Sequence, residues 1–129
     1  MRRRTCRWCG WLVLLCLPLL VPGCGRGRIK EVPPELLGVW RTEAPDYRDR
    51  FMEIRLTEIV FGTGAGTSDT YPINGLRREE DAGHIEYTIY YDNEEGQEYA
   101  FTIHFEYEGG GQIKLPNQRD MVWRRSPAR

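Results

Sequence analysis

The sequence contains two segments in which large apolar residues alternate strictly with other residues. In residues 84–91 and 98–107 every odd-numbered position is isoleucine, tyrosine or phenylalanine. Because successive side chains of a strand point to opposite faces, this period of two predicts two half-buried β-strands. Residues 93–96 between them, Asn-Glu-Glu-Gly, suit a type I turn followed by a glycine bulge. That turn predicts a hairpin in which paired residue numbers sum to 190, so that Ile89 lies opposite Phe101.

The rest of the chain after residue 35 shows the same rhythm in shorter runs. No long stretch has the 3.6-residue period of a helix, and turn residues interrupt the chain at short intervals. The predicted strands are residues 37–42, 50–56, 59–61, 70–76, 84–91, 98–107, 112–115 and 120–124. About eight short antiparallel strands in consecutive order predict an all-β fold, either a small up-and-down barrel or a strongly curved meander.

The first 24 residues have the composition of a secretory signal peptide. Four arginines and no acid precede an apolar run over residues 11–21, and small residues follow it. The run is too short to cross ~30 Å of hydrocarbon, which takes about 20 helical residues. Pro18 and Pro22 also interrupt a long helix. A cleaved signal peptide is therefore favoured over the alternative, a permanent transmembrane helix.

The end of this segment resembles the lipobox of bacterial lipoprotein precursors. Leu20, Val21, Gly23 and Cys24 match that pattern, whereas Pro22 departs from it. The resemblance implies that Cys24 is acylated, becomes the mature N-terminus and anchors the protein to a membrane; a freely secreted protein is the alternative. Gly25 resembles the sorting pattern of enteric bacteria that favours the outer membrane, facing the periplasm, over the inner membrane.

The predicted organisation has four parts. Residues 1–23 form the signal peptide, 24–34 the anchor cysteine and a flexible linker, 35–125 the barrel-like domain, and 126–129 a tail. All four cysteines lie at or before Cys24, so the domain is expected to fold without disulfides.

The charge of the domain excludes one class of partner. Residues 31–129 hold all 19 acidic residues and 11 basic ones, a net charge of −8, which argues against nucleic-acid binding. The basic residues Arg26, Arg28 and Lys30 precede the domain. They either lie against lipid headgroups or belong to a solvated tether.

Residues Gly38-Val39-Trp40 resemble the Gly-x-Trp motif in the first strand of lipocalin-like (calycin) barrels. In that family a basic residue of the last strand lies across the tryptophan, and Arg124 or Arg125 occupies the matching place. The resemblance implies binding of a small apolar ligand. The alternative is that Trp40 and Trp123 close the ends of a barrel filled by side chains. Tyr47, in a charged loop, is a candidate either for recognition or for capping the barrel.

The sequence offers little for catalysis. The domain has no cysteine and no serine in a nucleophile elbow, so neither an enzyme activity nor a cofactor is predicted. Under the 190 register His84 lies opposite Glu106 and His104 opposite Glu86, which suits metal ligation by residue type. Outward-facing cross-strand pairs without a metal are the alternative.

These observations favour a lipid-anchored protein of the cell envelope that acts as a small binding or interaction module. Its partners would be the membrane, through the N-terminal lipid, and an envelope protein or a small apolar ligand. An envelope metal-binding protein or hydrolase that uses the two histidines and two glutamates is the alternative.

Overall fold

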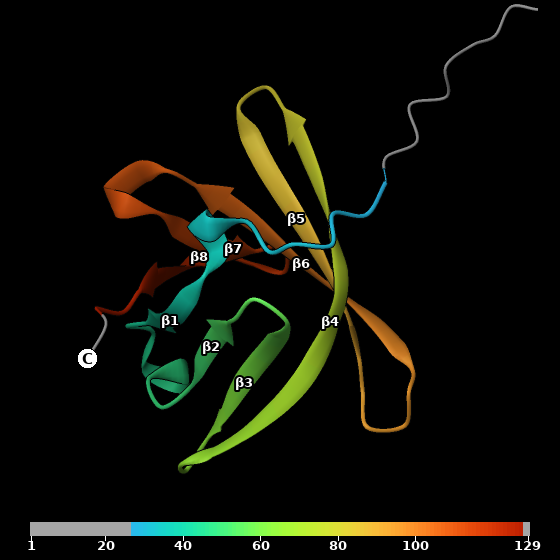
Figure 1. Ribbon diagram of the computed structural model, residues 1–129. Coiled ribbons are helices and arrows are strands. Elements are labelled where there is room, and N and C mark those ends of the chain that lie inside the picture. The colour runs from blue at the N-terminus through green and yellow to red at the C-terminus, as the bar shows by residue number, and fades with distance from the viewer. Residues whose placement is uncertain (1–26, 128–129) are drawn as a thin grey trace, which may run out of the picture.

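A computed structural model describes residues 27–127, which form a closed antiparallel barrel of eight strands in sequential order (Figure 1). The strands are β1 (Gly38–Thr42), β2 (Phe51–Ile54), β3 (Glu58–Gly64), β4 (Thr67–Asp81), β5 (His84–Asp92), β6 (Glu98–Glu106), β7 (Gln112–Leu115) and β8 (Gln118–Arg125). Three short 3₁₀ helices accompany them: η1 (Pro34–Leu36), η2 (Pro45–Tyr47) and η3 (Glu108–Gly110). The predicted up-and-down barrel is therefore confirmed. Residues 27–127 contain no helix long and apolar enough to span a bilayer.

The central hairpin has the predicted register. All β5–β6 pairs from Ile85–Phe105 to Asp92–Glu98 sum to 190. The Asn93 carboxamide oxygen accepts hydrogen bonds from the backbone N–H groups of Glu95 and Gln97, and Gly96 has a φ of 77°. Local turn chemistry therefore sets this register, as the sequence indicated.

Strands β3 and β4 are longer than predicted. The glycine-rich residues 62–68 lie between the predicted strands 59–61 and 70–76, yet most of them belong to β3 or β4, and the chain turns at Ala65 and Gly66, which both have positive φ. At its other end β4 continues beyond the predicted residue 76 through Glu79-Glu80-Asp81, an acidic run with the composition of a loop tip. Pairing with β5 as far as Asp81–His84 extends the strand, and an ion pair between Arg78 and Glu80 (2.6 Å) lies along it.

Side chains from all eight strands fill the core of the barrel. Strand β4 contributes Leu76, but its charged end contributes none. The fully buried residues include Trp40, Ile59, Tyr87, Ile103 and Ile113. This alternation of inward apolar and outward polar side chains is what closes a small barrel around a packed core.

The segment before β1 belongs to the folded domain. Residues 27–36 run from the β4 side across one end of the barrel to β1 (Figure 1). Ile29 exchanges two backbone hydrogen bonds with Leu76 of β4, and Arg28 forms a bidentate ion pair with Glu98. Val32 is 4% exposed. The part of the predicted linker that the structure describes is thus docked on the barrel and is not a solvated tether.

Candidate functional site

The end of the barrel that residues 27–36 cross is closed by Trp40 and its neighbours. The Trp40 indole N–H donates to the carbonyl oxygen of Leu36 at 2.9 Å, and both side chains are fully buried. The guanidinium carbon of Arg125 lies 5.1 Å from the centre of the Trp40 ring, and Arg125 also donates to the carbonyl oxygen of Glu35. A side chain at Gly38, whose φ is 130°, would press on Arg125 at 3.3 Å. Trp40 therefore closes this end rather than lining a ligand site.

Of the two candidate arginines, Arg125 occupies the place across Trp40. Arg124 lies one residue earlier on β8, opposite Arg41 of β1, and is exposed. The period of two explains this difference, because neighbouring residues of a strand face opposite sides of the sheet.

The same end carries a buried hydroxyl. Tyr87 donates to a carboxylate oxygen of Glu35 at 2.7 Å. Burial, followed by this hydrogen bond, raises the pKa of Tyr87 to about 12. The contact fastens η1 to the barrel wall and completes the closure.

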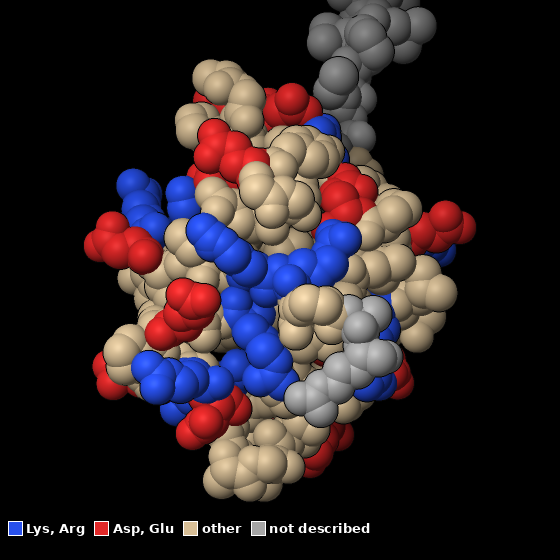
Figure 2. All heavy atoms as spheres, turned by 90° about the vertical axis from the view of Figure 1, so that its left-hand side faces the viewer, with Lys and Arg blue, Asp and Glu red and all other residues tan. Residues whose placement is uncertain are grey.

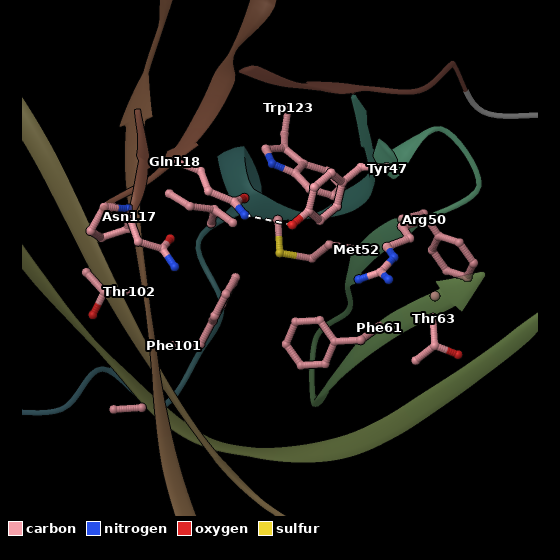
Figure 3. A pocket seen from close by; sticks show the side chains of 15 residues that line it. Tyr47, Arg50, Met52, Phe61, Thr63, Phe101, Thr102, Asn117, Gln118 and Trp123 are labelled. Carbon is pink, nitrogen blue, oxygen red and sulfur yellow. Dashed lines mark hydrogen bonds between the residues drawn. The ribbon is translucent and has the colours of Figure 1, made fainter. Parts of the chain in front are cut away.

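The opposite end holds a cavity of about 470 Å³. It lies between η2, β2 and β3 on one side and β6 and the β7–β8 turn on the other (Figure 3). The lining residues are Tyr47, Arg50, Phe51, Met52, Phe61, Gly62, Thr63, Ala100, Phe101, Thr102, Leu115, Pro116, Asn117, Gln118 and Trp123. Its size and its mainly apolar walls are typical of a small-molecule site.

Tyr47 and Trp123 form one wall of this cavity. Their rings meet edge to face with centroids 6.4 Å apart, and the Tyr47 hydroxyl accepts a hydrogen bond from the Gln118 side-chain N–H at 2.9 Å (Figure 3). Phe61 and Phe101 face them, with ring centroids 5.3 Å apart. The two residues that the sequence singled out, Tyr47 and Trp123, are therefore brought together at the open end.

Two buried polar atoms of the cavity wall have no hydrogen-bond partner among residues 27–127. They are the Trp123 indole nitrogen, a donor, and the Gln118 side-chain oxygen, an acceptor. Trp123 is only 6% exposed. Both atoms are enclosed by protein, so they add to the cost of the fold, about 1–3 kcal/mol each, and are not exposed to the cavity.

A row of tyrosines continues beyond the cavity. The Tyr71 and Tyr91 rings are 5.3 Å apart, and Tyr91 stacks on Tyr99 at 5.9 Å with 21° between their planes. Burial raises the pKa of Tyr91, and Tyr99 is 47% exposed. The mouth of the barrel is thus rich in aromatic rings that offer flat apolar faces.

The four metal candidates do not converge. His104 Nδ1 lies 3.7 Å from a carboxylate oxygen of Glu86. Glu106 is instead held by Lys114 at 2.9 Å and by Gln112, and these hydrogen bonds lower its pKa. His84 pairs with Asp81 at the start of β5. Within residues 27–127 no three His, Cys, Asp or Glu side chains form a group able to hold a metal ion.

The structure adds Arg50, Gln118, Phe61 and Phe101 to the residues that the sequence identified at this end. The alternation predicted for residues 98–107 placed Phe101 on the inner face, whereas the short predicted strand 59–61 assigned Phe61 to no face; barrel closure brings both rings to the cavity that Gln118 also lines. Cys24, the predicted lipidation site, lies outside the described residues.

Comparison with protein-family models, curated proteins and solved structures finds no match to this chain.

Proposed function

We propose that this chain is a lipid-anchored protein of the cell envelope whose barrel binds a small, mainly apolar ligand at its open end. The observation that carries the binding function is the 470 Å³ cavity with its mainly apolar and aromatic lining. The lipobox-like residues that end in Cys24 support the anchor. The Gly38-Val39-Trp40 motif, with Arg125 across the tryptophan, supports a lipocalin-like relationship.

The walls indicate the chemistry of the ligand. Phe61, Phe101 and Met52 offer apolar contact, which favours a flat hydrocarbon or aromatic body. The polar side chains of Thr102, Asn117 and Gln118 also line the cavity and suit a ligand that carries a hydroxyl group. The guanidinium of Arg50 lies 5.1 Å from the Tyr47 ring centre and borders the cavity (Figure 3). A planar alcohol or phenol is therefore the ligand class that fits.

The test uses 2-naphthol as a probe and the full chain in nonionic detergent. The indole N–H resonances are followed by NMR and assigned with Trp→Phe variants. We expect a saturable shift at Trp123 and none at Trp40, which is bonded to Leu36 at the closed end. Trp40 is thus an internal control for probe that merely partitions into detergent.

Substitution sharpens the test. Gln118→Ala removes a polar side chain from the cavity lining and should weaken naphthol binding roughly 2- to 12-fold, the range for one hydrogen bond. Gln97→Ala, in the exposed β5–β6 turn, should leave binding unchanged. Equal, non-saturating shifts at both tryptophans would show that the cavity does not bind this class of ligand.

A further inference from the structure

Some cations of residues 27–127 form ion pairs and others do not. Arg28, Arg55, Arg77, Arg78 and Lys114 each lie within ion-pair distance of a carboxylate. Arg41, Arg48, Arg124 and Arg125 lie together around one depression, and none of the four forms an ion pair within residues 27–127. Of the seven cations without an ion pair in this part of the chain, four therefore share the face that carries β1 and β8, and Lys30, Arg50 and Arg119 lie outside this depression.

This face is a band of positive charge (Figure 2). The depression of about 970 Å³ follows the seam between β1 and β8, and its walls include the four arginines together with Glu43 and Asp120. Its lining thus has a net charge of +2, whereas residues 31–129 as a whole carry −8. We refer to Arg41, Arg48 and Arg124 as the arginine seam; Arg125 borders the same depression but is engaged with the Trp40 ring and the Glu35 carbonyl oxygen.

At the centre of the arginine seam two like charges face each other. Arg41 of β1 and Arg124 of β8 are directly paired across the strands, and both are exposed. Opposite side chains of an antiparallel pair have their Cβ atoms about 4.5–5.5 Å apart, and like charges there are destabilising. Arg41 also lies against the ring of Phe51, with its guanidinium carbon 5.1 Å from the ring centre, so it is held over the sheet.

We propose that the arginine seam is an anion site that binds a phosphate monoester, with Arg41 and Arg124 as its principal contacts. A phosphate monoester carries a charge of about −1.5 to −2 at neutral pH and three acceptor oxygens, which balances the net charge of the lining. Guanidinium groups bind such oxygens in pairs of parallel hydrogen bonds. The anion would also relieve the repulsion between the two opposed arginines.

The position of the seam indicates a soluble source for this phosphate. Residues 28 and 29 dock on β4, β5 and β6, and in a closed eight-stranded barrel the β4–β5 pair is opposite the β8–β1 pair. Cys24 precedes Arg28 by four residues, which span at most about 14 Å. If Cys24 is acylated, as the proposed function requires, its membrane lies on the β4–β5 side and the arginine seam faces away from it.

The test is isothermal titration of the full chain in nonionic detergent, in a buffer without phosphate or sulfate. Glycerol phosphate is the monoester probe, and glycerophosphoglycerol, the water-soluble headgroup of phosphatidylglycerol, is the diester probe. We expect saturable binding of the monoester and at least tenfold weaker binding of the diester, which carries a single charge. Equal or tighter binding of the diester would overturn the soluble source and assign the site to a lipid headgroup.

Matched variants separate a built site from general charge attraction. Arg41→Gln/Arg124→Gln should raise the Kd for glycerol phosphate at least tenfold, since a hydrogen bond to a charged group typically accounts for a factor of about 10–100. Arg55→Gln/Lys114→Gln removes the same net charge from ion-paired positions outside the arginine seam, in the β2–β3 turn and on β7, and should leave the Kd unchanged.

The unfolding temperatures of the two double variants show whether a loss of binding reflects misfolding. Without ligand, Arg41→Gln/Arg124→Gln should unfold at the same or a higher temperature than the wild type, because it removes a like-charge pair. Glycerol phosphate should raise the unfolding temperature of the wild type alone. Absence of saturable binding by the wild type, or equal loss of binding in both double variants, would overturn the proposal.

Discussion

Leu36 is the residue whose truncation most directly tests how the barrel is closed. It lies in η1, before the first strand, and its side chain is fully buried against the core. Its carbonyl oxygen also receives the Trp40 indole N–H. If residues 27–36 close the barrel, Leu36→Ala opens a cavity beneath Trp40. If they only tether the domain, the same substitution has little effect.

The expected magnitude follows from the burial. Leu36→Ala removes three buried carbons, which at about 0.8 kcal/mol each amount to about 2.4 kcal/mol of lost transfer free energy. Incomplete collapse of the cavity brings the total to about 3–4 kcal/mol. For a domain of this size each kcal/mol lowers the melting temperature by about 4–8 °C, so a fall of about 15–25 °C is expected.

The assay is thermal and urea unfolding of the full chain, followed by far-ultraviolet circular dichroism. Leu56→Ala is the matched control, because Leu56 is 67% exposed and its truncation should change the free energy of unfolding by less than about 0.5 kcal/mol. A loss below about 1 kcal/mol for Leu36→Ala, or equal losses for the two leucines, would refute the reasoning that η1 is part of the core.

Two further predictions concern the closed end and the anchor. An unfolded tyrosine titrates near pH 10, and Tyr87 in the folded protein near 12, so the folded state holds this proton more tightly between those values. The free energy of unfolding should therefore fall as the pH rises from 10 toward 12, and Tyr87→Phe should show a shallower fall in urea midpoints; identical slopes would contradict the assignment. Mass spectrometry of membrane-fraction protein should find a chain that starts at Cys24 and carries acyl groups, and Cys24→Ala should abolish this form. An unmodified chain that begins elsewhere would exclude the lipoprotein interpretation.

The features that sequence reasoning predicted correctly are those fixed by local chemistry. The β5–β6 register follows from a turn of a few residues, where Asn93 bonds to the backbone and Gly96 takes the positive φ. The inward positions of Ile85, Tyr87 and Ile89 follow from alternation along β5. Each of these inferences needs only neighbours in the sequence, so the pattern of residues was enough.

The predictions that were wrong concern segments held by contacts with distant parts of the chain. The charged residues at the end of β4 have the composition of a loop, yet pairing with β5 holds them in a strand. The segment before β1 has the composition of a linker, with glycine, charge and two prolines. Its docking depends on Leu76 and Glu98, which are 47 and 70 residues away from Ile29 and Arg28. Tertiary contacts of this kind override local propensity, and composition carries no trace of them.

Both candidate binding sites depend on the pairing of β1 with β8. Arg41 and Arg124 meet only because the ends of the domain come together, and so do Tyr47 and Gln118, 71 residues apart. Closing so long a loop has an entropic cost that contacts along the seam must offset. Trp40 with Arg125 and Tyr47 with Trp123 supply aromatic contacts at the two ends of this pairing. The Arg41 guanidinium contacts the Phe51 ring, which favours an arginine at that position, but Arg124 directly opposite opposes the pairing by like-charge repulsion. The anionic ligand proposed above would offset this repulsion at the strand pair that closes the barrel.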